Sequence, residues 1–302
     1  MASARLLFAL VPLAGLLELT SHFFFSMRAP TGDDWSKLRG ALAAVAKPGD
    51  LIVAAPDWAD PLARRSFGDA MMPLAAVARP DESAFARAVE VGILGSHAPA
   101  LDGWRTVSET RAGRFALRVL ENPAPARVRY RFLDHVAPDQ LTVALGEREC
   151  AYTESGRPRT GGLFGPATVP SVRHECPGFP GVYAGVTVID DEEYRPRRCM
   201  WATPSAGEPL RLRYRDVPLG EKIYGYTGNS WFLYRDGRSA PVELVVRVGG
   251  DALGRAVHQP ADGWKRFEFS AGAHAGERED VEFELRATGS GERQLCFYAD
   301  SR

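Results

Sequence analysis

Excess positive charge is missing from this sequence. The chain has 37 Lys and Arg residues against 38 Asp and Glu residues, a formal net charge of -1. Proteins that bind nucleic acid usually show net basicity or a basic stripe, so we expect no nucleic-acid partner. The six histidines are also spread out, without an H-E-x-x-H or H-x-H motif. A transition-metal site therefore has little support from sequence spacing.

Glycine-rich phosphate loops are absent as well. The stretch "KPGDLIVAAPDWADP" predicts a buried strand over Leu51–Ala55, but "PDWADP" follows where a dinucleotide site needs G-x-G-x-x-G. No Walker lysine and no G-x-S-x-G elbow appear in the chain, which argues against nucleotide binding and a serine hydrolase. Asp57 and Asp60 form a carboxylate pair that we interpret as capping a helix rather than as a catalytic acid and base.

One long apolar segment opens the chain. Leu6–Met27 has about the length of a bilayer core, although it contains Pro12, Glu18 and His22. Three interpretations compete: a cleaved signal peptide, an uncleaved single-pass anchor, and a buried helix of a soluble protein. The bulky "TSHFFFSM" lacks an A-x-A-like cleavage site, so we favour a membrane anchor over residues 1–27. The bulk of the chain is then expected outside the cytoplasm, in the periplasm.

The four cysteines, Cys150, Cys176, Cys199 and Cys296, all lie from residue 150 onward, and none forms a CxxC pair. An even count behind an apolar N-terminus fits two disulfides in an oxidising compartment. Three pairings are open and the sequence does not choose among them. We favour Cys150–Cys176, which are close in sequence, with Cys199–Cys296; four buried free thiols are the alternative.

Residues 28–122 predict a small α/β domain, a Rossmann-like half. Capping residues and helical spacing predict a helix after Thr31 that stops at Pro48-Gly49. A strand over Leu51–Ala55, a short helix over Pro61–Phe67 and a second helix over Asp81–Val91 follow. Two extended runs around Ala112-Gly113 predict a closing hairpin.

Residues 127–302, behind the linker "ENPAPAR", show strand signals without helices between them. The runs "RVRYRFLDHV", "LRLRYRDV", "VELVVRVGG", "WKRFEFSA", "VEFELRAT" and "RQLCFYAD" are separated by Gly and Pro turns. This pattern predicts a β-sandwich of jelly-roll type. The overall fold class is thus α/β plus all-β. The acidic run "IDDEEYRP" indicates a solvated turn or, alternatively, a structural calcium site; we expect no other cofactor.

The stretch "KIYGYTGNSWFLYRDG" interleaves aromatic and polar residues. Sugar-binding sandwiches stack sugars on aromatic faces and bind their hydroxyls with amides, arginines and carboxylates. Ordinary sandwich cores show the same alternation, so a purely structural role is the alternative. The candidate ligand-binding residues are Tyr224, Tyr226, Asn229, Trp231, Arg235 and His258.

Two resemblances to known families add to this interpretation. Trp35, Pro48-Gly49-Asp50, "LIVAAPDW" and "GRFALRVLEN" resemble the C-terminal extracytoplasmic end of GT-C type membrane glycosyltransferases, across about a third of the chain. The early membrane helices that carry the catalytic acids of that family have no counterpart here. The resemblance implies an accessory domain without the transferase core, and it transfers no functional residue.

Residues 127–302 resemble galactose-binding-like jelly rolls, the fold of many carbohydrate-binding modules. The residues that carry this resemblance run from "VELVVRVGG" through "DGWKRFEFSAGAHAGEREDVEFELRA" to "RQLCFYADSR". The fold alone does not transfer a ligand. We expect a non-catalytic protein that binds envelope glycan or polysaccharide, with a glycan-assembly enzyme as an expected partner. An enzyme related to glycosyltransferases or hydrolases, with its site between the domains, and a structural protein-interaction module are the alternatives.

Overall fold

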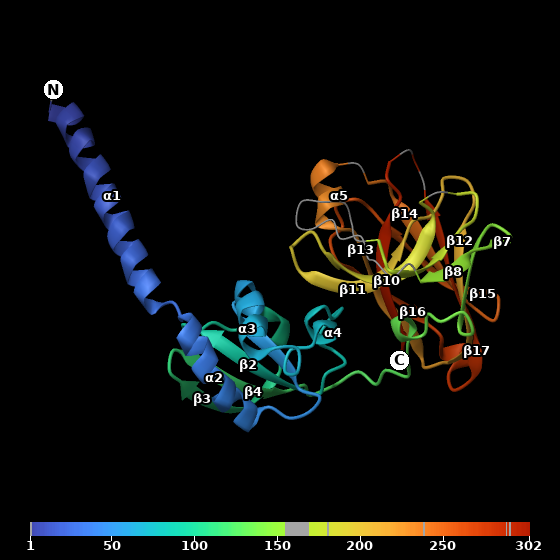
Figure 1. Ribbon diagram of the computed structural model, residues 1–302, viewed down its shortest axis with the longest axis horizontal. Coiled ribbons are helices and arrows are strands. Elements are labelled where there is room, and N and C mark those ends of the chain that lie inside the picture. Colours follow the sequence, from blue (N-terminus) through green and yellow to red (C-terminus); the bar gives the residue numbers. More distant parts are fainter. Residues whose placement is uncertain (1, 155–168, 180, 238, 288, 290) are drawn as a thin grey trace. The chain divides into compact units, whose positions relative to one another are not determined.

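A computed structural model describes residues 2–154, 169–179, 181–237, 239–287, 289 and 291–302 (Figure 1). The chain divides into two compact units. Unit 1 comprises residues 1–76 and 82–125, and unit 2 comprises residues 77–81 and 126–302. Residues 77–81 thus belong to unit 2 although they interrupt unit 1 in the sequence, which the sequence boundaries did not show.

The N-terminal apolar segment forms helix α1 (Ala2–Arg28). Across the part of the chain that the structure describes, no helix combines the length and the apolar character needed to cross a membrane.

Helix α2 (Gly32–Val45) of unit 1 begins where the sequence predicts. The Thr31 side chain accepts a hydrogen bond from the Asp34 N–H, and the Asp34 carboxylate accepts one from the Thr31 N–H at 2.8 Å, which makes a capping box. Trp35, Leu38 and Leu42 are buried on one face of the helix. The Trp35 ring packs on Phe115 with centroids 4.7 Å apart, which fixes the helix against the sheet.

The sheet of unit 1 has the order β1-β2-β4-β3. Its strands are β1 (Leu51–Ala55), β2 (Arg87–Ile93), β3 (Arg105–Ala112) and β4 (Phe115–Glu121). Strands β1 and β2 are parallel, and β3 and β4 form the predicted hairpin. The helix predicted over Asp81–Val91 is wrong. Ala88–Ile93 is buried and pairs with strands on both sides, so sheet formation overrides its helical propensity.

Short helices complete unit 1. They are η1 (Asp57–Ala59), α3 (Asp60–Phe67), α4 (Leu74–Val77) and η2 (Pro99–Leu101). Helix α3 confirms the short helix predicted after the first strand. Since the sheet contains one parallel pair and an antiparallel hairpin, a Rossmann-like half stays a prediction.

Unit 2 is a β-sandwich whose arrangement fits a jelly roll (Figure 1). One sheet contains β5 (Tyr130–Arg131), β8 (Ala151–Glu154), β9 (Val172–Glu175), β10 (Tyr183–Asp190), β11 (Pro196–Ala202), β13 (Lys222–Gly228), β16 (Lys265–Ser270) and β18 (Leu295–Ser301). The second sheet contains β6 (Leu141–Leu145), β7 (Arg148–Glu149), β12 (Leu210–Pro218), β14 (Val242–Val248), β15 (Asp251–His258) and β17 (Arg278–Ala287). All strand pairs within these sheets are antiparallel.

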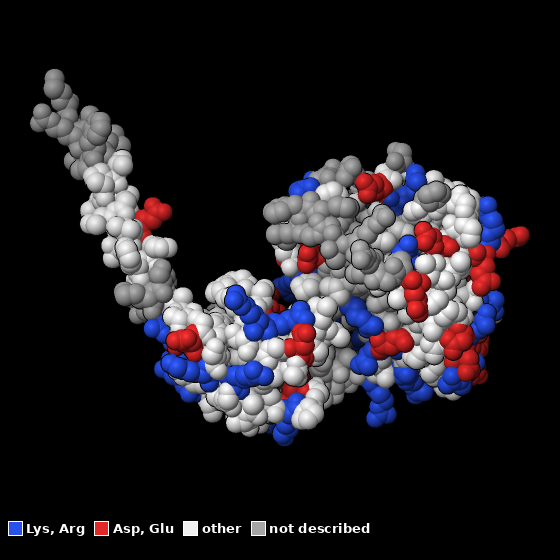
Figure 2. All heavy atoms as spheres, viewed as in Figure 1, with Lys and Arg blue, Asp and Glu red and all other residues white. Residues whose placement is uncertain are grey.

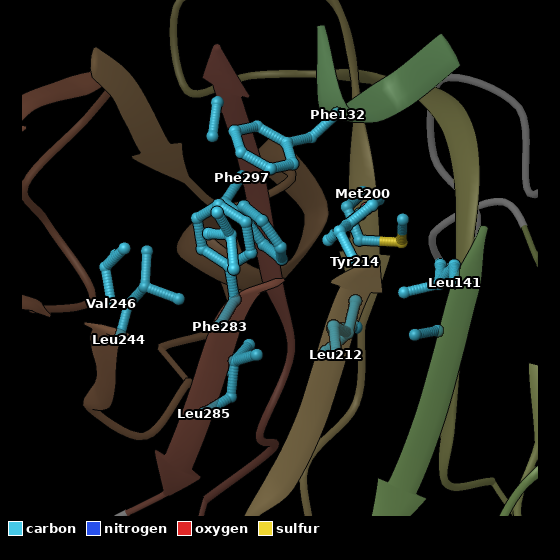
Figure 3. Packing of buried hydrophobic residues seen from close by; sticks show 14 of the residues in the cluster. Phe132, Leu141, Met200, Leu212, Tyr214, Leu244, Val246, Phe283, Leu285 and Phe297 are labelled. Atoms are coloured by element: carbon cyan, nitrogen blue, oxygen red, sulfur yellow. The ribbon is translucent and has the colours of Figure 1, made fainter. Parts of the chain in front are cut away.

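The core of unit 2 lies between the two sheets. Figure 3 shows side chains from both sheets pointing toward one another, with Phe283 and Phe297 at 5.3 Å between ring centroids. Val242, Leu244, Val246 and Val248 of β14 are buried and alternate with more exposed residues, as the sequence predicts. The inward residues of "VELVVRV" therefore place one face of the strand in the core.

Two expectations for unit 2 are wrong. A short helix, α5 (Trp231–Asp236), interrupts the predicted all-β pattern, because Leu233 is buried and packs in a cluster with Trp201. The run "RVRYRFLDHV" is a strand only over Tyr130–Arg131 and then turns into η3 (Phe132–Asp134). Phe132 is fully buried in that turn and packs on Tyr214, so the core position outweighs the strand pattern.

Both disulfides of unit 2 have the expected pairing, Cys150–Cys176 and Cys199–Cys296, and the described residues contain no free cysteine. On the face shown in Figure 2, Lys and Arg side chains are interleaved with Asp and Glu side chains.

Candidate functional site

The six residues predicted to bind a ligand separate into three places in unit 2. Tyr224 and Tyr226 lie on β13, and their ring planes are nearly perpendicular at a centroid distance of 5.7 Å. Asn229 and His258 are buried, each 1% exposed. Trp231 and Arg235 lie on α5. The structure therefore brings Tyr224 together with Tyr226 and Trp231 together with Arg235, while Asn229 and His258 are buried.

Tyr224 and Tyr226 are occupied by the segment Val77–Asp81, which we call the docked segment. The Tyr224 and Tyr226 hydroxyls donate hydrogen bonds to the Asp81 carboxylate at 2.6 and 2.9 Å. Burial raises the pKa of the Tyr226 hydroxyl far above its ordinary value, and the neighbouring Tyr224 and Asp81 add to the effect. Both phenols therefore stay neutral and serve as hydrogen-bond donors to Asp81.

Aromatic and arginine side chains hold the rest of the docked segment. The Trp264 ring stacks parallel to the Tyr226 ring at 5.4 Å, and its indole N–H donates to the Pro80 carbonyl at 2.9 Å. Arg197 donates to the same carbonyl at 3.2 Å, and the Arg198 N–H donates to the Ala78 carbonyl at 2.8 Å. These aromatic and basic groups thus have the peptide chain of the protein itself as a partner.

Asn229 and His258 belong to the interior of the sandwich. The His258 ring lies 3.2 Å from the Thr227 hydroxyl, while its Nε2 and both amide atoms of Asn229 have no hydrogen-bond partner. Burial lowers the pKa of His258 to about 4, with Asp262 opposing the shift and Lys265 adding to it. His258 is therefore a neutral core histidine near pH 7.

Trp231 and Arg235 meet a residue that was not among the predicted ligand-binding residues. The Trp231 ring lies 4.9 Å from the Tyr194 ring and also 4.9 Å from the Arg235 guanidinium carbon. Tyr194 is 53% exposed, and Arg235 is exposed as well. We call these three residues, Tyr194, Trp231 and Arg235, the aromatic platform.

Tyr194 has an unusual backbone conformation. Its φ of 63° lies in the left-handed region, which a bulky residue rarely adopts and which costs about 1–3 kcal/mol. The turn is held by Asp191, which is buried: its carboxylate accepts from the Glu193 and Arg195 N–H groups, each at 2.9 Å. The other carboxylate oxygen accepts from Arg197 at 2.8 Å. Three hydrogen bonds to Asp191 thus hold the turn in this conformation, and the turn presents an aromatic ring to solvent.

Polar groups flank the aromatic platform. Glu193 and Arg195 are exposed next to Tyr194 and form an ion pair at 3.4 Å. The alternative of a calcium site in this acidic run gains nothing from the geometry, because Asp191 is used by backbone N–H groups and Arg197. Among the described residues, the group of three side chains able to hold a metal ion lies elsewhere, at His274, Glu277 and Glu279.

Unit 1 uses its acids in structural contacts. Asp60 lies in the first turn of α3, and its carboxylate accepts from the Ala54 N–H at 3.1 Å. This contact fastens the turn between β1 and α3, whereas we expected Asp60 to cap the helix. Asp57 begins η1, which has no side-chain cap. Asp60 is therefore part of the local fold.

A buried carboxylate in unit 1 was missed by the sequence reasoning. Glu90 on β2 is fully buried and accepts from the Ala98 N–H at 2.6 Å and from Arg118 at 2.8 Å. His97 Nδ1 lies 2.8 Å from the same carboxylate, and its Nε2 lies 3.2 Å from Asp102. Glu90 thus holds the turn that follows its strand.

The sequence offered one indication of a function for Tyr194, namely that it is an aromatic residue within an acidic turn. Its contact with Trp231 joins the β10–β11 hairpin to α5, and a single sequence does not report such a contact. Trp264 was noticed only as part of "DGWKRF", and its stacking on Tyr226 depends on the register between β13 and β16.

Comparisons with known proteins show only remote likenesses. No family model and no curated protein matches the chain. One similar solved structure holds the CBM51-2 and INT domains of Clostridium perfringens ZmpB, with 12% identity over 38% of this chain and a TM-score of 0.28. The present chain spans about a quarter of that protein, 25% of its length.

Two further solved structures are carbohydrate-binding modules with bound sugars. CBM51 from Clostridium perfringens GH95, in complex with methyl-galactose, has 9% identity over 39% of this chain and 81% of its own, with a TM-score of 0.27. TmCBM61, in complex with β-1,4-galactotriose, has 12% identity over 59% of this chain and 100% of its own, with a TM-score of 0.27. At these values the likenesses do not identify a ligand for this chain. The resemblance to GT-C glycosyltransferases stays a prediction.

Proposed function

We propose that this protein binds glycan without catalysis, and that the sugar lies on the aromatic platform of Tyr194, Trp231 and Arg235. The observation that carries the proposal is the exposed Tyr194 ring, which is held in a costly backbone conformation and packs on Trp231. Strained residues persist where the surrounding structure enforces them, and they cluster at functional sites. The aromatic faces suit the apolar face of a sugar ring.

Groups for the sugar hydroxyls stand beside the rings. Arg235 offers N–H donors at the Trp231 face, and Glu193 offers carboxylate oxygens at the neighbouring position of the turn. Opposite charges side by side suit a neutral polyol better than a strongly charged ligand. The same set of residues therefore supports a neutral or weakly charged polysaccharide as the ligand class.

The place of the protein in the cell is part of the proposal. Two disulfides in unit 2 support an oxidising compartment outside the cytoplasm. A role beside a glycan-assembly enzyme, and attachment to a membrane through residues 1–27, follow from the sequence resemblance and composition alone.

A glycan array probed with the oxidised protein tests the proposed function. We expect specific retention of a glycan class by the wild type, and its loss in Trp231→Ala and Tyr194→Ala. Trp58→Ala is the matched control, because Trp58 is an exposed tryptophan of unit 1, 64% accessible, outside the aromatic platform. An array on which the wild type retains no glycan contradicts the proposal, as does equal retention by all four proteins.

A further inference from the structure

A second cluster of side chains in unit 2 has the composition of a metal site. One imidazole nitrogen and two carboxylate oxygens, from His274, Glu277 and Glu279, lie within 4.8 Å of one another. His274 Nδ1 and Glu279 Oε1 are 3.0 Å apart. We propose that these three residues bind a divalent first-row transition-metal ion, for which Zn²⁺ is the probe.

The chemistry of the donors selects the class of ion. Imidazole nitrogen favours zinc and its first-row neighbours, whereas calcium and magnesium prefer oxygen ligands alone. Zinc ligands lie about 2.0–2.2 Å from the metal, which puts neighbouring ligand atoms about 3.0–3.5 Å apart. The distance between His274 Nδ1 and Glu279 Oε1 is at the lower end of this range. A small inward movement of Glu277 completes three protein ligands.

The backbone holds the loop that carries two of these ligands. His274 ends η4 (Gly272–His274), and Glu277 follows a turn in which Gly276 has a φ of 91°. The Gly276 N–H donates to the Leu219 carbonyl at 3.0 Å, and the Leu219 N–H donates to the Glu277 carbonyl at 2.9 Å. These two bonds fix the turn against Leu219, the residue that follows β12, so the ligands are pre-positioned.

Glu279 is positioned by a glycine. A Cβ at Gly249 would collide with the Glu279 carboxylate, so the side chain reaches its place only because residue 249 has none. Gly249 also has a φ of 57°, and its N–H donates to the Asp280 carbonyl at 3.1 Å. One carboxylate oxygen thus packs on the β14–β15 turn, and the other faces His274.

Metal binding changes the hydrogen bonding of His274. A carboxylate only accepts hydrogen bonds, so His274 Nδ1 donates one to Glu279 in the metal-free protein. For Nδ1 to bind the ion, this hydrogen bond breaks and the neutral ring carries its proton on Nε2 instead. The ion then lies between the imidazole nitrogen and the carboxylate that were hydrogen-bonded to each other.

The ion would join the two sheets of the sandwich. His274 follows β16 of the eight-stranded sheet, while Glu279 lies on β17 of the six-stranded sheet. Because a metal that binds only the folded state stabilises it by mass action, zinc should raise the unfolding temperature of unit 2. This role is independent of the proposed glycan site.

Isothermal titration and thermal unfolding with ZnCl₂ test the site in the intact chain. We expect one zinc ion per chain, a higher unfolding temperature with zinc, and affinity reduced at least tenfold in His274→Gln and in Glu277→Gln. Glu277 is exposed, so its replacement leaves the fold intact and keeps the test valid if His274→Gln is unstable. Glu268→Gln, on the neighbouring strand, and His97→Gln, at the other histidine flanked by acids, should keep wild-type affinity.

Any of three results would overturn the inference. The first is that the wild type takes up no zinc. The second is that Glu277→Gln binds zinc as the wild type does, and the third is that zinc binding is lost in His97→Gln instead. In each of these cases the cluster is an ion pair between His274 and Glu279 with a neighbouring acid.

Discussion

The hydroxyl of Tyr226 lies 2.9 Å from the carboxylate of Asp81, although the two residues are 145 positions apart in the sequence. Tyr224 donates to the same carboxylate, so one acid accepts from a buried and a half-buried phenol. Tyr224 and Tyr226, two of the three aromatic residues that we predicted to bind a ligand, therefore hold the docked segment. The aromatic platform lies elsewhere, with Tyr194 in the turn between β10 and β11 and with Trp231 and Arg235 on α5.

Removing Asp81 should destabilise unit 2. In Asp81→Ala the two phenols lose their shared acceptor, and a buried polar group without a partner costs about 1–3 kcal/mol. Thermal unfolding measures the loss. The control is Asp81→Ala combined with Tyr224→Phe and Tyr226→Phe, which removes the unpaired hydroxyls and should recover part of the stability. If Asp81→Ala alone is as stable as the wild type, this role for Asp81 is contradicted.

Lowering the pH should destabilise the protein in the range in which His258 is protonated in the unfolded state but not in the folded state. Burial lowers the pKa of His258 in the folded state to about 4, against an ordinary value of 6.5. Between these values the unfolded state binds more protons, so the stabilisation is complete above pH 6.5 and is lost as the pH falls toward 4. The lost stability is about 3 kcal/mol.

Calorimetry between pH 4 and 7 on the wild type and on His258→Asn measures this dependence. His174, whose pKa is also lowered by burial, contributes in the same direction, so the variant should keep a shallower slope. An unchanged slope in His258→Asn would show that His258 does not produce the effect.

Glu90 should be needed for the stability of unit 1. Glu90→Ala leaves the Arg118 guanidinium without its buried partner and the Ala98 N–H without an acceptor, a change that costs about 3–5 kcal/mol. Glu109→Gln is the matched control, because Glu109 also pairs with Arg118, at 3.2 Å, but is 54% exposed. Unfolding temperatures that fall equally in both variants would contradict the role of Glu90 as the buried acceptor for Arg118 and Ala98.

Tyr194→Gly should separate stability from binding. Glycine adopts a positive φ without the steric cost that tyrosine bears, so the variant should be as stable as the wild type or more stable. The same change removes the aromatic ring that we propose contacts the sugar, so glycan affinity should drop. A clear loss of stability would show that the ring contact with Trp231 matters chiefly for folding.

The sequence predicted elements whose cause is local. The Thr31 capping box and the alternation of β14 are readable from neighbouring residues, and α2 and β14 lie where expected. β2 was missed because a strand buried on both faces shows no alternation, and Ala88–Ile93 then has the composition of a helix. Local pattern thus predicts amphipathic elements better than fully buried ones.

The candidate site was predicted only in part because its contacts are distant in the sequence. Trp231 and Arg235 were marked, since both occur in one aromatic and polar stretch. Tyr194 was missed as a partner, because its position depends on the turn that Asp191 holds and on the start of α5. Register and turn geometry place these rings together, and one sequence does not report either.

The affinity of the wild type and of Trp231→Ala for a glycan selected on the array tests the central claim most directly. Stacking on a buried or partly buried aromatic contributes about 0.5–1.5 kcal/mol beyond the area that it covers. We expect Trp231→Ala to bind at least fivefold more weakly, Tyr194→Phe to keep the wild-type affinity, and Trp58→Ala to be unchanged. Equal affinity of Trp231→Ala and the wild type would contradict the assignment of the aromatic platform as the glycan site.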